Sequence, residues 1–346
     1  MSTLPSASSE KPRILVTGAS GAVGPRVVEA FHAAGCSVRT LSLDLPGNGL
    51  FPSGVETQVG DITDSEAVCG AVQGIDAVVH MAALLHIKDP EPALQKEYER
   101  INVGGTETVV HASITAGVKR VVLFSTIAVY GYKTGQILKE DTEPAPDTFY
   151  GQTKHAAEQI VLAAHLPDSR PLGTVLRLSA VYGARVKGNY RRLLESLARG
   201  RFVPIGSGAN RRTLVYDKDV AAATVLAALH PAAAGLVYNV SDGLFHTMNE
   251  IVQTLSEALG RPSPRITLPA GPARFAAGIV EDVVTGLGRK SPIARSTIDK
   301  YTEDVAVSSQ RIQAELGFVP QFDLAKGWQE TVREMRQAGD LVKVRC

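Results

Sequence analysis

Short apolar segments alternate along the first half of the chain with longer segments of helical period. The short segments are rich in Val, Ile and Leu with little polar alternation, which is typical of strands covered on both faces of a parallel sheet. They comprise residues 13–17, 37–43, 55–59, 76–80, 120–125 and 174–178. The segments between them predict helices over residues 22–34, 65–72, 93–116 and 150–164. This order predicts an α/β fold with a Rossmann-type doubly wound parallel sheet.

The regular alternation ends after residue 178, and a smaller C-terminal α/β domain that binds the substrate is expected to follow. Short strands are expected near Phe202 and Leu236, and helices over residues 217–229, 248–259 and 324–337. Residues 268–287 are apolar but include charged side chains, so they predict an amphipathic helix pair and no membrane span. We expect a loose tail over residues 1–10, a dinucleotide-binding domain over 11–180 to which a segment near 215–240 returns, and a mainly substrate-binding domain over 181–346.

Composition and charge exclude several classes of protein. Hydrophobic residues make up 44% and charged residues 21% of the chain, as in globular proteins. Thirty-six basic and thirty-five acidic residues leave a net charge of only +1. The chain therefore lacks the basic excess that would indicate nucleic acid or anionic lipid as a partner. The three cysteines are far apart, no zinc-type spacing occurs, and the first residues lack signal-peptide features. We therefore expect a soluble cytoplasmic protein without a metal site.

A glycine-rich turn, G-A-S-G-A-V-G, separates the first predicted strand from the first predicted helix. Glycine lets the backbone approach a pyrophosphate, and the start of a helix offers unpaired N–H groups and a partial positive charge. The alternative is an ordinary glycine turn, but the strand–turn–helix context favours dinucleotide binding. The turn residues expected to hold the cofactor are Gly18, Gly21, Ala22, Val23 and Gly24.

Two acidic residues are candidates for the adenosine end of the cofactor. Asp44 lies about 20 residues after Gly24, where a carboxylate commonly binds the ribose hydroxyls. Its charge would repel a 2′-phosphate and so favour NAD over NADP. Asp61 ends the third strand and could meet the adenine. The alternatives are a solvated turn residue at Asp44 and a helix N-cap at Asp61.

Tyr150 and Lys154 are four residues apart on a predicted helix, so their side chains share one face. A free tyrosine has a pKa near 10 and is about 0.1% ionised at neutral pH. An adjacent ammonium and an oxidised nicotinamide both favour the phenolate. Thr126 ends the strand that precedes this helix, where its hydroxyl could reach a ligand or could simply cap the strand. The alternative for Tyr150 and Lys154 is a surface pair without a role.

Several motifs occur in one order between residues 13 and 335, and together they resemble the extended short-chain dehydrogenase/reductase family, in its NAD-dependent epimerase/dehydratase branch. The motifs are T-G-x-x-G-x-x-G from Thr17, Asp61-Ile62, His80-Met81-Ala82-Ala83, Asn102-Val103-Gly104-Gly105-Thr106, Ser125-Thr126 with Val129-Tyr130-Gly131, and Tyr150-x-x-x-Lys154. The resemblance implies that Tyr150 is the catalytic base and that Lys154 binds the nicotinamide ribose and lowers the pKa of Tyr150. It also implies that Thr126 hydrogen-bonds the reacting oxygen.

The same resemblance assigns further binding residues. Ile62, Met81, Ala82 and Ala83 would line the cofactor, and Asn102 would lie on the helix behind it. Arg212 matches the arginine that contacts the substrate diphosphate in the sugar-nucleotide branch, and its alternative is a surface pair with Asp217 or Asp219.

The sequence departs from the family pattern in three places. The family alignment places Ser42 at the usual position of the ribose-binding acid, instead of Asp44. Ala180 stands where sugar-nucleotide enzymes commonly have a substrate-binding asparagine. Ile127 and Ala128 follow Thr126 where dehydratases and decarboxylases of the family carry acidic residues, which an epimerase does not need.

The resemblance therefore implies an NAD-dependent nucleotide-sugar 4-epimerase that acts through a transient 4-keto sugar. One alternative is a net NAD(P)-dependent reductase or dehydrogenase of a 4-keto sugar or a hydroxysteroid-like alcohol. Another is a non-catalytic NAD-binding regulatory protein. Family members are often homodimers, through the helices that match residues 93–116 and 150–164.

Overall fold

Parallel strands form the sheet that supports the candidate site. The computed structural model describes residues 11–85, 91–133, 135–287, 291 and 295–341, so the expected tail over residues 1–10 lies outside the described residues. Within those ranges the sheet has seven strands, all paired in parallel. Their order is β11 (Val237–Val240), β7 (Gly173–Leu178), β5 (Arg120–Thr126), β4 (Ala77–His80), β1 (Arg13–Thr17), β2 (Ser37–Ser42) and β3 (Glu56–Val59).

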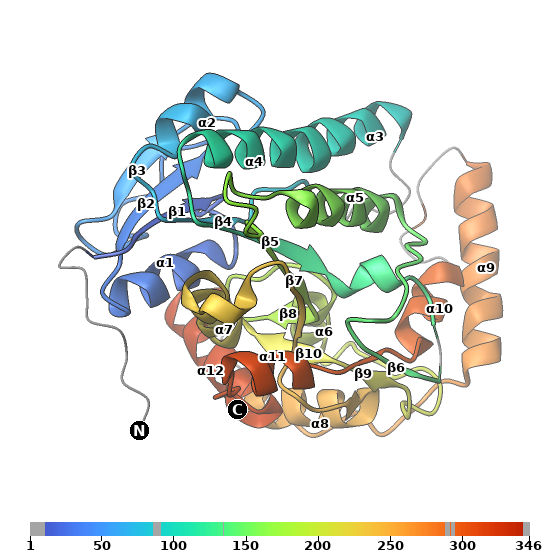
Figure 1. The fold of residues 1–346 in the computed structure, drawn as a ribbon. Coiled ribbons are helices and arrows are strands. Elements are labelled where there is room, and N and C mark those ends of the chain that lie inside the picture. Colours follow the sequence, from blue (N-terminus) through green and yellow to red (C-terminus); the bar gives the residue numbers. More distant parts are fainter. Residues whose placement is uncertain (1–10, 86–90, 134, 288–290, 292–294, 342–346) are drawn as a thin grey trace.

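Helices cover both faces of this sheet, as the apolar strands predict (Figure 1). Helices α1 (Gly24–Ala33) and α7 (Asp217–Leu229) pack on one face. Helices α2 (Ser65–Ala71), α4 (Gly105–Thr115) and α5 (Phe149–Ala163) pack on the other. Side chains of one strand alternate between the two layers, because Ile14 and Val16 join the first core and Leu15 joins the second. The predicted Rossmann-type doubly wound fold is confirmed.

The strand order fixes where a ligand can bind. The chain runs from β1 outward to β2 and β3 and then returns to β4 on the other side of β1. In open α/β sheets, ligands bind beyond the carboxyl ends of the strands at such a reversal. The edge strand β11 comes from the second half of the chain and pairs with β7 through Val237 and Val175.

The second half builds a separate core beside the sheet. Helices α6, α8 and α12 enclose it, and Trp328 of α12 stacks on Tyr182 with ring centroids 4.3 Å apart. The helices of this half are α6 (Asn189–Ala198), α8 (Met248–Leu259), α9 (Ala270–Gly286), α10 (Arg295–Thr302), α11 (Gln310–Leu316) and α12 (Leu324–Gln337). The strands of this half form two-stranded sheets. They pair as β8 (Ala180–Tyr182) with β10 (Leu214–Tyr216), and β9 (Arg211–Arg212) with β12 (His246–Thr247). The last strand, β13 (Ala306–Val307), pairs with β6 (Ile137–Leu138) from the first half.

Three expected elements differ from the structure. The helix expected over residues 93–116 is divided into α3 (Pro92–Tyr98), a π-helical segment (Glu99–Gly104) and α4. The pair expected over residues 268–287 is wrong: the segment forms one helix, α9, because Pro272 lies in its first turn, where proline is tolerated. The strand expected near Phe202 is also wrong. Only a single bridge forms there, between Ile205 and Leu268, because the chain turns into helix α9 directly after it, with Pro269 as the N-cap.

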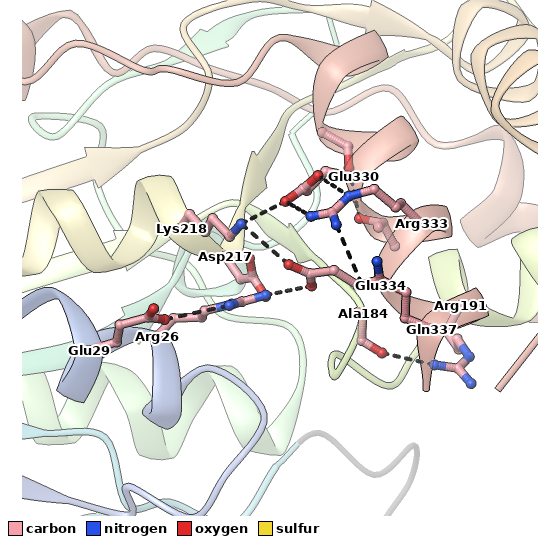
Figure 2. A network of polar contacts seen from close by, with 12 residues as sticks. Arg26, Glu29, Ala184, Arg191, Asp217, Lys218, Glu330, Arg333, Glu334 and Gln337 are labelled. Atoms are coloured by element: carbon pink, nitrogen blue, oxygen red, sulfur yellow. Dashed lines mark hydrogen bonds and ion pairs between the residues drawn. The ribbon is translucent and has the colours of Figure 1, made fainter. Parts of the chain in front are cut away.

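A network of charged residues joins the C-terminal helix to the Rossmann sheet's helices (Figure 2). Arg26 of α1 pairs with Glu334 of α12 and lies 3.6 Å from the carboxylate of Asp217 on α7. Lys218 of α7 pairs with Glu330 of α12 at 2.9 Å. Asp217 is fully buried, so its environment decides its protonation.

We predict that Asp217→Asn changes how stability depends on pH. Burial raises the pKa of Asp217 to about 6, with Arg26 lowering it and Glu334 raising it further. A carboxyl whose pKa is higher in the folded chain than in the unfolded chain stabilises the fold most below its unfolded pKa. This stabilisation is lost as the pH rises through the folded pKa. Relative to Asp217→Asn, the natural chain should lose up to about 3 kcal/mol of unfolding free energy between about pH 4 and pH 7.

Urea unfolding of both chains across this range measures the difference. Asp141→Asn, at an exposed position, serves as the control and should follow the natural chain. The same pH dependence in the natural chain and in Asp217→Asn would contradict the raised pKa of Asp217.

Candidate active site

The glycine turn after β1 is tightly packed and suits close approach of a ligand. Gly18 has φ of 70°, and a Cβ there would lie 2.8 Å from the backbone of Ala82. A Cβ on Gly24 would lie 2.0 Å from the carbonyl oxygen of Ala19. Helix α1 begins at Gly24. Its N-cap residue is Val23, whose apolar side chain accepts no hydrogen bond from the N–H groups in the first turn of the helix. A pyrophosphate could therefore accept from these N–H groups, so the residues present fit the dinucleotide.

The adenosine end has two candidate positions. Ser42 ends β2, and its hydroxyl accepts a hydrogen bond from the N–H of Ser20 in the glycine turn, at 3.3 Å. Asp44 lies two residues beyond the strand and is exposed. The ribose-binding role predicted for Asp44 stays a prediction, and Ser42 is the residue that touches the turn.

Asp61 lies at the carboxyl end of β3. Burial works against its charge, but hydrogen bonds from Thr63 and Arg100 hold the pKa of Asp61 below its ordinary value. The N-cap of α2 is Asp64, whose side chain accepts hydrogen bonds from two backbone N–H groups. The alternative for Asp61, that it is the N-cap of this helix, is therefore wrong. Ile62 is buried against Gly105 at the start of α4.

Asn102 connects the loop after β4 to helix α5. It is buried in the π-helical segment, and its side-chain oxygen accepts from the N–H of Leu84 at 2.7 Å. Its amide donates to the carbonyl of Leu84 and to the hydroxyl of Thr153, both at 3.2 Å. The other end of this loop is held by β1, because the N–H groups of Met81 and Ala82 donate to Thr17. Asn102 therefore fixes the segment of Met81, Ala82 and Ala83 that is predicted to line the cofactor.

Thr126 and the start of α5 are held together by close backbone packing. Thr148 caps α5 by accepting from the N–H of Gly151 at 3.1 Å. A Cβ on Gly151 would lie 2.9 Å from the carbonyl oxygen of Ala128, two residues after Thr126. The Thr126 hydroxyl accepts from the N–H of Ala128 at 3.2 Å, so Thr126 does act as the strand-end cap that was one of its alternatives. A capping hydroxyl keeps its own proton available to donate to a ligand.

Tyr150 lies one residue into α5 and is partly buried. Its ring meets that of Tyr98 edge to face, with centroids 6.4 Å apart. Burial, and secondarily Tyr98, raises the pKa of Tyr150 to about 12. This direction is opposite to the lowering expected for the NAD-bound enzyme. In the protein itself the phenol is neutral, and an added positive charge would be needed to favour the phenolate.

Lys154 lies one helical turn further and is almost fully buried, with 3% of its surface exposed. Burial lowers the pKa of Lys154 to about 8, and the carboxylate of Glu158 works in the opposite direction. Burial and the nearby Lys154 charge lower the pKa of His80 to about 3, so this imidazole is neutral. The ring nitrogens of His80 lie 2.8 Å from the hydroxyl of Thr17 and 3.1 Å from that of Thr106. Of Lys154 and His80, Lys154 is therefore the one that carries a positive charge at neutral pH.

A buried ion pair beneath Lys154 was not anticipated from the sequence. Glu158 of α5 has no exposed surface and pairs with Arg177 of β7 through two hydrogen bonds, at 3.0 and 2.8 Å. Ser125 of β5 also donates to this carboxylate. The signal was present, because Glu158 follows Lys154 by one helical turn and Arg177 interrupts an apolar strand.

Arg212 lies on β9 and turns toward α10. Its guanidinium donates to the backbone carbonyls of Lys300 and Tyr301 and lies 3.6 Å from the carboxylate of Glu303. The expected alternative, a pair with Asp217 or Asp219, is wrong, since Asp219 accepts from the backbone of residues 321 and 322 instead. The diphosphate-binding role of Arg212 stays a prediction.

Comparison with family models agrees with this geometry. The model described as the NAD dependent epimerase/dehydratase family matches residues 14–241. The chain belongs to the NAD-dependent epimerase/dehydratase family. NAD is therefore its cofactor, as predicted, and Tyr150 and Lys154, the predicted catalytic residues on α5, lie within the matched range.

Two curated relatives of this family member act on different substrates. One is the N-acetyl-alpha-D-glucosaminyl-diphospho-ditrans,octacis-undecaprenol 4-epimerase of Escherichia coli O157:H7, 29% identical over 324 residues, which cover 92% of this chain and 94% of the relative. The other is the 3 beta-hydroxysteroid dehydrogenase/Delta 5-->4-isomerase of Mycobacterium tuberculosis strain CDC 1551 / Oshkosh. It is 30% identical over 338 residues, which cover 92% of this chain and 88% of the relative.

A solved structure with a similar fold is MoeE5 in complex with UDP-glucose and NAD. Its TM-score is 0.73 at 26% sequence identity, and the match covers 94% of this chain and 99% of that chain. Within the described part of the family member, no helix is long and apolar enough to cross a membrane. The same residues contain no group of three or more His, Cys, Asp or Glu side chains placed to hold a metal ion.

We predict that Gly24→Ala weakens NAD binding by at least about tenfold, because the new Cβ would lie 2.0 Å from the Ala19 carbonyl and force the turn to move. Isothermal titration with NAD measures the affinity. Gly47→Ala is the matched control, since a Cβ there meets nothing within 4 Å. An unchanged affinity in Gly24→Ala would show that this turn does not hold the dinucleotide.

Proposed function

We propose that this family member is an NAD-dependent epimerase of a sugar carried on a diphosphate, and specifically a nucleotide-sugar 4-epimerase that acts through a transient 4-keto sugar. The observation that carries the proposal is the arrangement on α5. Tyr150 stands beside the turn that begins at Thr126, and the buried cation Lys154 lies one helical turn below it. The diphosphate is common to the UDP-glucose bound by MoeE5 and the diphospho-undecaprenol substrate named for the Escherichia coli relative.

The protein's own residues would handle one proton. The phenol oxygen of Tyr150, once deprotonated, would accept the proton of the sugar 4-hydroxyl and later return it, and Thr126 would donate a hydrogen bond to the reacting oxygen. When bound, NAD supplies the site that accepts and returns a hydride. A positioned base of this kind typically contributes about 10²–10⁴-fold to the rate. The ammonium of Lys154 would stabilise the phenolate and bind the nicotinamide ribose.

The residues after Thr126 favour epimerisation over dehydration or decarboxylation. Ile127 and Ala128 are apolar and carry no group that could move a second proton. An epimerase needs a base only at the hydroxyl that is oxidised and reduced again. Arg212, already facing the C-terminal end of α10, would hold the diphosphate while the keto sugar turns over.

The second candidate function is a net dehydrogenase or reductase of an apolar alcohol or a 4-keto sugar. The hydroxysteroid dehydrogenase relative is 30% identical over 92% of this chain, which favours this alternative. Ala180 favours it too, because a methyl group offers no hydrogen bond to a sugar.

We also propose a homodimer through the outer faces of α3, α4 and α5, and a cytoplasmic location. Figure 1 shows these helices side by side on one face of the sheet, with no further layer of helices over them. Sedimentation velocity of the purified chain tests the dimer.

Tyr150→Phe should keep NAD affinity within about twofold and lower turnover by at least about 10²-fold, because it removes only the phenol oxygen that carries the proton. Tyr132→Phe, at an exposed tyrosine, is the matched control and should retain full turnover. UDP-hexoses and UDP-N-acetylhexosamines with deuterium at C4 serve as substrates, and NMR follows the products. An epimer that keeps its deuterium supports the proposal.

Loss of the deuterium with a matching change in NADH absorbance would replace the epimerase with the net oxidoreductase. Undiminished turnover in Tyr150→Phe would contradict both candidate functions, since each uses the same phenol.

A further inference from the structure

Tyr98 is fully buried and belongs to none of the motifs on which the family resemblance depends. It ends helix α3, which lies on the same face of the sheet as α4 and α5 (Figure 1). Among the residues of α3, all of which the structure describes, it is the one buried side chain. Tyrosines are more often only partly buried, because the hydroxyl is polar. The complete burial of Tyr98 therefore indicates specific partners for its ring and for its hydroxyl.

The ring of Tyr98 contacts two consecutive aromatic residues at the start of α5. Its centroid lies 6.4 Å from that of Tyr150 and 6.0 Å from that of Phe149, with interplanar angles of 67° and 78°. Both are edge-to-face contacts at separations that aromatic pairs favour. Consecutive residues of an α-helix point about 100° apart, so a ring that meets both opposes rotation of this turn about the helix axis. Tyr98 therefore constrains the direction in which the Tyr150 ring points.

The hydroxyl of Tyr98 holds the loop after β4. It donates a hydrogen bond to the carbonyl oxygen of Leu85. The preceding residue, Leu84, is held through its backbone by Asn102. The start of the same loop is attached to Thr17 of β1. The loop whose first residues are predicted to line the cofactor is therefore attached at its other end to Tyr98.

A π-helical segment brings these contacts together. Tyr98 is its N-cap, and Asn102 lies within it. Such segments are rare and occur frequently at functional sites. Tyr98 contacts α5 at Tyr150, and Asn102 contacts it at Thr153, next to Lys154. The π-helical segment therefore connects the loop to α5 beside both predicted catalytic residues.

We propose that Tyr98 is a positioning residue for the reaction: its ring orients the phenol of Tyr150, and its hydroxyl fixes the loop that lines the cofactor. The base and the cofactor must meet at one point, and a single side chain would set the place of both. Tyr98 itself takes part in no proton transfer. Because it acts through Tyr150, this role rests on the proposed function.

The positioning device lies entirely within the dinucleotide-binding half. Tyr98, Leu85 and Tyr150 all precede residue 180, so the base and the loop are aligned without a contribution from the substrate-binding half. A misplacement of about 1 Å between reacting groups can lower a rate by about 10²-fold. Loss of the Tyr98 ring should therefore lower kcat, whereas loss of the hydroxyl alone should weaken NAD binding.

Tyr238 provides the matched control for a purely structural role. It is also fully buried, and its hydroxyl donates to the carboxylate of Glu315 at 2.8 Å. It belongs to the edge strand β11 and to the core on the other face of the sheet. Tyr238→Phe should lower the midpoint of thermal unfolding and leave NAD affinity and kcat as in the natural chain.

Two substitutions in the full chain separate the two contacts of Tyr98. Tyr98→Phe keeps the ring and should weaken NAD binding by about two- to tenfold, as expected for one lost hydrogen bond, with isothermal titration as the measurement. Tyr98→Leu also removes the ring. Its kcat with a UDP-hexose, at saturating NAD and substrate, should fall at least about tenfold below that of Tyr98→Phe. Thermal unfolding shows whether each variant is folded at the temperature of the assay.

Equal NAD affinity in Tyr98→Phe and the natural chain would overturn the proposal. So would equal kcat in the two Tyr98 variants. If Tyr98→Leu does not fold, the NAD affinity of Tyr98→Phe decides by itself. A natural chain that turns over no UDP-hexose would contradict the proposed function, whereas the NAD titration would still test the loop contact of Tyr98.

Discussion

The complete burial of Glu158 is the constraint on which the candidate site depends. A buried carboxylate is tolerated only when its charge is paired and its oxygens accept hydrogen bonds, and removing a partner costs about 3–5 kcal/mol. Arg177 of β7 and Ser125 of β5 supply these bonds, so α5 can adopt only one position against the two strands. Tyr150 and Lys154 belong to the same helix, and that position therefore fixes them as well.

Glu158 also sets the charge of the site. Burial alone would drive Lys154 toward its neutral form, and the carboxylate one turn away keeps its pKa at about 8, so the side chain is mostly cationic at neutral pH. Tyr150 remains neutral in the protein itself, with a pKa of about 12. Under the proposed function, the phenol becomes a base only when a further positive charge joins Lys154. The base and the cofactor would then act together, which protects the site from unproductive proton transfer.

The sheet was predictable because parallel strands buried on both faces leave a plain apolar pattern. All six expected strands end within one residue of the observed carboxyl ends. Helices α7, α8 and α12 match their expected bounds. Elements that depend on a distant partner were not predictable. The π-helical segment exists where Asn102 reaches Leu84, and the expected strand near Phe202 finds no partner beyond one bridge.

The candidate site divides in the same way. Motif residues on the glycine turn and on α5 could be identified as candidates because the functions predicted for them require a fixed local spacing. The positions of Glu158 and Arg177 each carried a signal, but the two residues are 19 apart along the chain, and no fixed local spacing shows that they pair. The outward face of α9 was misread as half of a packed helix pair, since sequence period reveals an apolar stripe but not the side on which it lies.

The central claim is that a positive charge brought by the cofactor converts Tyr150 from a neutral phenol to a base. Its most direct test is a titration of Tyr150 by NMR, with ¹³C-labelled tyrosine and Tyr150→Phe to assign the signal. Without NAD the pKa of Tyr150 should be about 12. With saturating NAD⁺ it should fall by at least about two units. The same pKa in both states would contradict the account.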